Sequence, residues 1–310
     1  MGCLLSLSSA PFACLGDKKY YDLQGTIDVM KQVFSKSVVD GFELQLEPEW
    51  DSKQPPLSDR ECADWTKTPK YTAQQVSDLL RGQGLPILSV HASRDIGIYL
   101  CSNRDSDLES GREVVRDALF VASELNASVC VFHLWDTWAT SFNTDRIHVL
   151  FTEITDGFPN VKASVENIPT HLSGSTPFTL VRDFEHVTLD LRWAALYDEL
   201  DKFQSISDKL ANVHLRGRLD GERWVIDRSS FDFYEGLKKI THNWKYEGLL
   251  TLEREGTLNS SHFNDFVRAT GDLSRLVHEG SDRSRVHSHT EKDHCEPRLE
   301  MGGNKRGAIV

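Results

Sequence analysis

The chain has 310 residues, of which 39% are hydrophobic and 26% are charged, and this length suits one large α/β barrel or two small domains. Its formal net charge of −12 repels phosphate backbones, and it contains no apolar run near the ~20 residues that cross a bilayer, so neither nucleic acid nor a membrane is an expected partner. The six cysteines are scattered without a CxxC pair, which is typical of reduced thiols and predicts a cytoplasmic protein.

Short apolar segments recur along the chain and predict eight β-strands. They begin roughly 25 to 45 residues apart, as repeated strand–loop–helix units require. The segments are Cys3–Ser9, Phe42–Leu46, Pro86–His91, Ser128–Leu134, Val161–Glu166, His186–Leu191, Ala211–Leu215 and Gly248–Glu253. The first segment follows a loose N-myristoylation pattern at Gly2, but a barrel needs a strand at this position, and we expect one there.

Helical patterns occupy the gaps between these strands. They cover Thr26–Lys36, Thr72–Arg81, Leu108–Leu125, Phe231–Ile240 and Ser261–Leu276. Strands that alternate with helices predict a parallel sheet, and eight such units predict closure into a single (β/α)₈ TIM barrel. An open, doubly wound sheet is the alternative, although no GxGxxG motif follows the first strand to support its dinucleotide-binding form.

The end of the chain differs in composition from the rest. Residues 279–310 are polar, mixed in charge and nearly free of aliphatic side chains before Ile309. Such a segment cannot bury enough apolar surface to offset the entropy that ordering costs, so we expect a disordered tail after one domain of residues 1–278. The tail histidines His287, His289 and His294 follow no standard zinc-binding spacing, which favours a solvated tail over a metal site.

Four consecutive predicted strands end in polar side chains that can bind a metal. These are Glu166, Asp190, His214 and Glu253. In a barrel the C-terminal ends of the strands converge on one mouth, where active sites lie. Three carboxylates at one point would repel one another and stay partly protonated unless a cation lay among them. One nitrogen and three oxygen ligands favour a single Mn²⁺ ion, ahead of Mg²⁺, Co²⁺ or Zn²⁺.

Other polar and aromatic residues fall at the same predicted mouth. His91 and His133 end the third and fourth strands and could bind substrate hydroxyls or a second metal. Trp135 and Trp138 could line the pocket or stack on a sugar ring, or they could be core residues. Glu43 could contact substrate or be a structural charge inside the barrel. Six strand ends in sequence that carry histidine or acid favour a functional site over surface chance.

The order of these motifs resembles the xylose isomerase-like TIM-barrel superfamily, which includes sugar isomerases and epimerases, inosose dehydratases and endonuclease IV-type repair enzymes. The resemblance spans roughly residues 1–276, and each motif is weak alone. The matching stretches are Asp40–Leu44, His91, His133, Val165–Asn167, Leu189–Asp190, Val213–Leu215 and Leu252–Glu253.

The resemblance also implies a reaction. In the ketose epimerase branch, the residues that match Glu166, Asp190, His214 and Glu253 bind the metal, and the two glutamates exchange protons with substrate. The chain is thus expected to be a metal-dependent sugar or sugar phosphate isomerase or epimerase. It would act by proton transfer next to a carbonyl, through an enediolate. The expected partner is a small polyhydroxylated or sugar-like substrate, and homo-oligomers are common in the family.

The chain departs from the family pattern at several positions. These departures change the substrate that we expect and leave other functions open. Trp193 and Ser229 stand where the endonucleases carry metal-binding histidines, so a trinuclear zinc site is not expected. Arg216 and Arg218 replace a Lys-Asp pair of many relatives and are predicted to hold an anionic substrate group. An endonuclease IV-like phosphodiesterase, which would act on abasic DNA, is disfavoured by the missing ligands and the acidic charge. An inosose dehydratase-like lyase and a non-catalytic metal-binding barrel stay open, the latter because of Arg192 and the two substituted arginines.

Overall fold

The computed structural model describes residues 2–18, 21–49, 70–256 and 258–290, with residues 279–290 as backbone only. Eight parallel strands pair in a closed ring, because β1 pairs with both β2 and β9, and β9 pairs with β7. The ring consists of β1 (Leu4–Ser8), β2 (Gly41–Gln45), β3 (Ile87–His91), β4 (Val129–Phe132), β5 (Lys162–Glu166), β6 (Val187–Asp190), β7 (Leu210–Asp220) and β9 (Leu249–Arg254). The predicted (β/α)₈ barrel and its eight strands are therefore confirmed.

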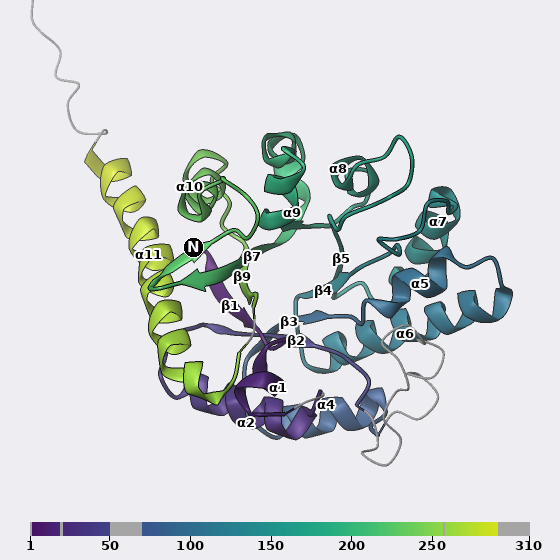
Figure 1. Ribbon diagram of the computed structural model, residues 1–310, viewed down its shortest axis with the longest axis horizontal. Coiled ribbons are helices and arrows are strands. Elements are labelled where there is room, and N and C mark those ends of the chain that lie inside the picture. The colour runs from purple at the N-terminus through teal and green to yellow at the C-terminus, as the bar shows by residue number, and fades with distance from the viewer. Residues whose placement is uncertain (1, 19–20, 50–69, 257, 291–310) are drawn as a thin grey trace, which may run out of the picture.

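Helices surround the ring of strands on its outside (Figure 1). The longer ones are α2 (Leu23–Phe34), α4 (Ala73–Arg81), α6 (Asp105–Glu124), α7 (Thr144–Thr155) and α11 (Phe263–Thr290). The shorter ones are α1 (Phe12–Leu15), α5 (Asp95–Cys101), α8 (Pro177–Val181), α9 (Leu191–Leu196), α10 (Phe233–Lys238), η1 (Leu200–Lys209), η2 (Lys239–Asn243) and η3 (Ser260–His262). Each of the five predicted helices overlaps at least one of these, while α1, α5, α7, α8, α9 and η1 were not predicted. Within the described residues, no helix combines the length and the apolar character that spanning a membrane requires.

The helix starts follow local capping chemistry. Thr72 caps α4 and forms a capping box with Gln75, which satisfies two backbone N–H groups at the first turn. Asp22 accepts a hydrogen bond from the backbone N–H of Gly25 at the start of α2. The apolar side chains of both helices then pack on the outer face of the strands, so the main hydrophobic core lies between barrel and helices.

The inner face of the barrel is mostly polar toward the C-terminal ends of the strands. A small apolar cluster, in which Val129, Val131, Ala211 and Leu249 take part, is separate from the main core. Further along the strands, Ser164 and Thr188 are linked by a hydrogen bond of 2.6 Å. Since side chains alternate across a strand, every second residue from this level on points toward the barrel axis at the mouth.

Two features of the fold lie beyond the sequence expectations. Strand β7 continues to Asp220 and pairs antiparallel with an extra strand, β8 (Arg223–Val225), through a turn that contains Gly221. Helix α11 continues as far as Thr290, past the expected domain end at residue 278. The rest of the expected tail, residues 291–310, lies outside the described residues, as do the side chains of His287, His289 and His294.

Candidate metal centre and active site

The four side chains predicted as metal ligands meet at the C-terminal mouth of the barrel. One ligand atom from each of Glu166, Asp190, His214 and Glu253 lies within 4.8 Å of all the others. The Nδ1 atom of His214 is 3.4 Å from Oε2 of Glu166 and 3.6 Å from Oε2 of Glu253. They come together because Glu166, Asp190 and Glu253 occupy inward positions at or next to the ends of β5, β6 and β9, and His214 on β7 is the register partner of Asp190.

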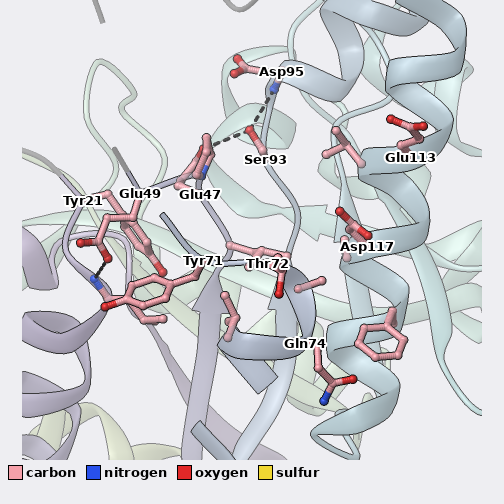
Figure 2. A pocket seen from close by; sticks show the side chains of 18 of the residues that line it. Tyr21, Glu47, Glu49, Tyr71, Thr72, Gln74, Ser93, Asp95, Glu113 and Asp117 are labelled. Atoms are coloured by element: carbon pink, nitrogen blue, oxygen red, sulfur yellow. Dashed lines mark hydrogen bonds between the residues drawn. The ribbon is translucent and has the colours of Figure 1, made fainter. Parts of the chain in front are cut away.

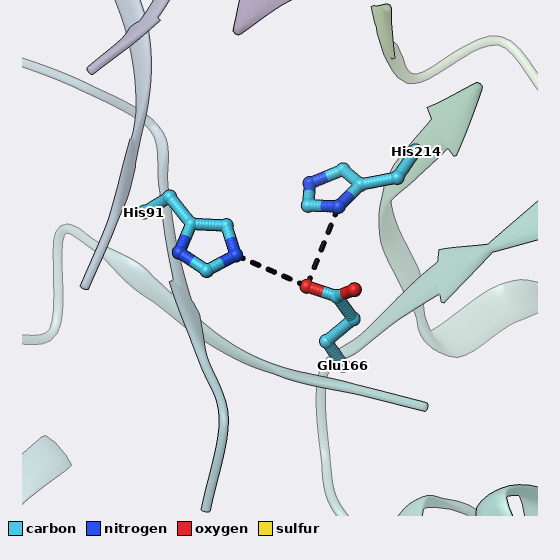
Figure 3. A group of neighbouring side chains, drawn as sticks. All are labelled: His91, Glu166 and His214. Atoms are coloured by element: carbon cyan, nitrogen blue, oxygen red, sulfur yellow. Dashed lines mark hydrogen bonds and ion pairs between the residues drawn. The ribbon is translucent and has the colours of Figure 1, made fainter. Parts of the chain in front are cut away.

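Glu166 also binds the two histidines of the third and fourth strands. Its Oε2 atom accepts hydrogen bonds from Nε2 of His91 at 3.1 Å and Nε2 of His133 at 3.0 Å. Figure 3 shows His91 and His214 converging on this carboxylate from different strands. His91, Glu166 and His214 form a second group whose donor atoms could hold an ion. The prediction that His91 and His133 belong to the same site as Glu166 thus agrees with their positions.

The histidines around Glu166 determine the charge state of its carboxylate. Burial opposes ionisation of Glu166, but the charges and hydrogen bonds of His133 and His214 outweigh it and hold the pKa of Glu166 well below its usual range. Burial likewise disfavours the charged form of His91, yet its hydrogen bond to Glu166 raises the pKa of His91 to about 9. Nδ1 of His91 donates to the carbonyl oxygen of Ala92, so both ring nitrogens act as donors in the cationic form.

Several buried atoms at the centre make no hydrogen bond within the described part of the chain. They are Oε1 of Glu166, Nδ1 of His214 and Oε2 of Glu253. A buried polar atom that makes no hydrogen bond costs roughly 1–3 kcal/mol. One nitrogen and two carboxylate oxygens that face a common centre form a donor set that a divalent cation would satisfy, so these residues fit a metal ion.

A fourth carboxylate lies behind the three of the cluster and orients His214. Oε2 of Glu43, on β2, accepts hydrogen bonds from Ser89 Oγ at 2.8 Å, Asn212 Nδ2 at 3.0 Å and His214 Nε2 at 3.3 Å. Burial opposes its charge, but His214, His91 and Ser89 together lower the pKa of Glu43. These hydrogen bonds to Ser89, Asn212 and His214 favour the structural alternative over substrate contact.

Asp190 is fixed by hydrogen bonds around it. Its backbone N–H donates to Oδ1 of Asn167 at 2.5 Å, and the side-chain amide of Asn167 donates to the Asp190 carbonyl at 3.2 Å. Oδ1 of Asp190 accepts from the backbone N–H of Trp193 and so caps α9. Burial raises the pKa of Asp190 to about 8 even though Arg216 favours its charged form. Its second oxygen, Oδ2, is the one that faces the cluster, 3.4 Å from Arg216.

The two predicted anion-binding arginines lie in different places. Nη1 of Arg216 is 3.4 Å from Asp190 Oδ2 and 3.6 Å from Glu253 Oε2, so this guanidinium is part of the cluster. Arg218 lies further along β7, where it pairs with Asp220 and Asp227 at 3.8 Å and 3.3 Å. Binding of an anionic substrate group by either arginine stays a prediction.

The two tryptophans predicted near the mouth differ in exposure, and the structure adds one acidic residue to the site. Trp135 is 3% exposed and donates to the Pro169 carbonyl, which favours its core alternative. Trp138 is 76% exposed and stacks on His171 with ring centroids 5.0 Å apart. The sequence analysis missed Glu255, which accepts from Nε of Arg216 at 2.8 Å. Its signal was available, because Glu255 is two residues after Glu253.

A cavity of about 560 Å³ lies beside the barrel mouth, and the four cluster residues are absent from its described lining. Figure 2 shows that it is bordered by acidic side chains from the segments after β2 and β3 and from α6. Ser93 donates to Glu47 at 3.0 Å across one wall. Desolvation by burial raises the pKa of Glu47. Within the described residues, the cavity lining and the cluster thus share no side chain.

Comparisons with known proteins bear on the fold. No protein-family model matches the chain, and no curated protein matches it. Solved structures similar to it include an L-ribulose 3-epimerase, 11% identical with a TM-score of 0.62, where the match covers 95% of this chain and 100% of that one.

Two further solved structures have related names. A sugar phosphate isomerase/epimerase from Parabacteroides distasonis ATCC 8503 is 15% identical with a TM-score of 0.58, over 88% of this chain and 94% of that one. A D-tagatose 3-epimerase-like protein is 18% identical with a TM-score of 0.55, over 88% and 98%. At such identities the similarity establishes the fold.

Proposed function

We propose that this chain, which has the fold of the xylose isomerase-like TIM-barrel superfamily, is a divalent-metal-dependent isomerase or epimerase of a sugar or sugar phosphate. The observation that carries the proposal is the meeting of Glu166, Asp190, His214 and Glu253 within 4.8 Å at the barrel mouth. The atoms at its centre that make no hydrogen bond fit a cation, and the donor set favours Mn²⁺ over Mg²⁺, Co²⁺ or Zn²⁺. A bound divalent ion would supply Lewis-acid polarisation of a substrate carbonyl.

The positions of Glu166 and Glu253 support a role for both in proton transfer. Glu166 is held ionised by its histidine partners, which is the state of a general base. Glu253 reaches the same point from another strand, and its side chain keeps 15% exposure toward the mouth. One carboxylate would take the proton on the carbon next to the carbonyl, and the C–H electron pair would move to give an enediolate. Return of a proton to that carbon from the other side gives epimerisation, and return to the neighbouring carbon gives isomerisation.

The histidines would orient the substrate. His133 is the more accessible of the two that bind Glu166, with 17% side-chain exposure against 5% for His91. Donation from their Nε2 atoms positions the Glu166 carboxylate, and the more exposed His133 would be the one to contact a substrate hydroxyl. A small polyhydroxylated substrate is supported by the names of the similar structures, which are sugar epimerases and isomerases. The cytoplasmic location and a homo-oligomeric state stay predictions.

The test combines metal analysis with isotope exchange. Purified protein is analysed for bound elements, loaded with Mn²⁺, and incubated in D₂O with a panel of ketoses, inososes and sugar phosphates. Deuterium at the carbon next to the carbonyl, detected by NMR and lost on chelation, is the expected result. A Glu166→Gln variant serves as the control for background exchange.

Other outcomes separate the alternatives. Loss of water from an inosose without an epimer product would favour the lyase, and nicking of abasic DNA would favour the phosphodiesterase. Firm binding of an ion without turnover of any panel member would favour a non-catalytic barrel. Each of these results would contradict the proposed isomerase or epimerase.

A further inference from the structure

The guanidinium of Arg216 lies where the metal ligands meet. Because β7 alternates its side chains, Asn212, His214 and Arg216 all face inward, and Arg216 is the register partner of Glu253 on β9. Its Nη1 atom is 3.4 Å from Oδ2 of Asp190 and 3.6 Å from Oε2 of Glu253. An arginine side chain therefore contacts the same carboxylate oxygens that a bound ion would use.

A clamp outside the cluster holds this guanidinium. Nε of Arg216 donates to Oε1 of Glu255 at 2.8 Å, and Glu255 also forms an ion pair with Arg192. The guanidinium carbons of Arg192 and Arg216 lie 4.5 Å and 5.3 Å from the centre of the Trp193 ring. Glu255 and Trp193 thus hold Arg216 by its Nε and its face, while its Nη1 reaches the cluster.

The positive charge of Arg216 has opposite effects on the ion-free and ion-bound cluster. Without an ion, it is the cation nearest to Asp190 among the described residues, and it lies as close to Oε2 of Glu253 as His214 does, so its charge reduces the repulsion between the two carboxylates. With an ion on the same oxygens, a guanidinium nitrogen within 4 Å of two ligand atoms would repel it. Arginine stays charged at every relevant pH, so it cannot remove this conflict by losing its proton.

We propose that Arg216 is a resident counter-cation of the cluster, which stabilises Asp190 and Glu253 in the ion-free protein and competes with a divalent ion for their oxygens. Binding of the ion requires Nη1 to leave these oxygens, and the bond from Nε to Glu255 keeps the displaced guanidinium at the rim of the mouth. The site then loads only at a higher ion concentration than its ligands alone would need. This inference rests on the metal site of the proposed function.

The test compares Arg216→Met with the wild type by calorimetric titration of Mn²⁺ into chelator-treated, full-length protein. Removal of the competing charge is expected to tighten Mn²⁺ binding at least tenfold, or about 1.4 kcal/mol. Arg218→Met is the matched control, because Arg218 lies on the same strand as Arg216 and carries the same charge but pairs with Asp220 and Asp227. Its Mn²⁺ affinity is expected to equal that of the wild type.

Thermal unfolding gives a second readout that is independent of turnover. In EDTA, Arg216→Met is expected to melt below the wild type because Asp190 and Glu253 lose their counter-cation. Addition of Mn²⁺ should then raise its melting temperature by more than it raises that of the wild type. If the methionine variant does not fold, Arg216→Gln replaces it, since the amide keeps polar contacts without the charge.

The outcomes distinguish this inference from the proposed function. If a folded variant without the Arg216 charge binds Mn²⁺ no more tightly than the wild type, and the wild type binds it firmly, Arg216 is not a competing counter-cation. The metal site of the proposed function is then still supported. Binding by the variant alone supports the inference in its strongest form. No binding of Mn²⁺, Mg²⁺, Co²⁺ or Zn²⁺ by any of the proteins overturns the metal site and the inference together.

Discussion

Oε2 of Glu43 lies 3.3 Å from Nε2 of His214, although the two residues are 171 positions apart in the chain. The carboxylate on β2 reaches across the barrel interior to the imidazole on β7. A hydrogen bond from Nε2 leaves Nδ1 as the nitrogen that faces Glu166 and Glu253. Carboxylate partners of this kind fix the tautomer and the ring orientation of metal-binding histidines. The orientation of one predicted ligand therefore depends on a residue outside the ligand set.

Replacement of Glu43 by glutamine should weaken metal binding without loss of the fold. The amide keeps the volume of the side chain but removes the charge that holds the Nε2 proton of His214. We expect about 10- to 100-fold weaker Mn²⁺ binding by calorimetry, as for other outer partners of metal ligands. Ser89→Ala, which removes one hydrogen bond from Glu43, is the control and should have a smaller effect. Unchanged affinity in Glu43→Gln would show that His214 needs no such partner.

Replacement of Glu166 by glutamine should abolish turnover and preserve the fold. The amide oxygen can still accept a hydrogen bond from His91 or His133, but the side chain can no longer take a proton. Loss of a general base typically lowers the rate by about 10²- to 10⁴-fold. The measurements are kcat, deuterium incorporation and the circular dichroism spectrum. Glu109→Gln, on the exposed face of α6, should retain full activity; equal rates for both variants would rule out Glu166 as the base.

The ion-free protein should lose stability as the pH rises from about 7 to about 9. The folded-state pKa values of Asp190 and His91 are raised to about 8 and about 9, so both groups bind more protons in the folded than in the unfolded chain over this range. Unfolding free energy falls with pH wherever the folded state holds the extra protons. The carboxyls with lowered pKa values, Glu43 and Glu166, titrate at lower pH and do not oppose this trend.

Urea unfolding in EDTA at the two pH values measures this effect. Asp190→Asn removes one of the two groups and should reduce the dependence on pH. Saturating Mn²⁺ should reverse the trend, because ligands bind metal only after they lose their protons, so the ion stabilises the protein more at higher pH. A rise in ion-free stability over the same range would contradict the charge states assigned to the cluster.

The sequence predicts the barrel and the cluster for one physical reason. Strands that are buried by helices read as apolar runs, and in such runs a terminal Glu166 or Asp190 stands out. The closure of the ring then brings the strand ends together without any further information. Glu43 was left open because its partners Ser89 and His214 lie on other strands. Only the strand arrangement shows that its carboxylate faces them.

The position of Arg216 depends on features that the sequence pattern does not display. The apolar segment of β7 ends near Leu215, but the strand continues to Asp220 because it pairs with β8 through a hairpin. Because the strand continues, the side chains of β7 still alternate between its two faces at this point. Arg216 therefore points inward, next to Glu253. An arginine after a strand reads equally well as a surface or anion-binding residue. Its contact with the ligand carboxylates follows from the register between β7 and β9.

The packing of α5 gives a test of how the mouth is supported. A Cβ atom on Gly97 would lie 2.5 Å from the carbonyl carbon of Trp135 and 3.0 Å from the backbone nitrogen of Asp136, in the loop that follows His133. Backbone atoms cannot move aside as a flexible side chain can, so the helix and the loop must separate. Gly97→Ala should therefore lower the free energy of unfolding by about 1–3 kcal/mol, the cost of overpacking.

Gly82→Ala is the matched control for this substitution. Its Cβ would have no neighbour nearer than 3.8 Å, and its φ of −70° suits alanine. It should leave stability unchanged or raise it by about 0.4–1 kcal/mol, because alanine restricts the unfolded chain. Alanine at either position lowers the conformational entropy of the unfolded chain by the same amount. Urea unfolding of the two variants therefore isolates the steric effect at Gly97. Equal stability of the variants would mean that α5 does not press on the loop after β4.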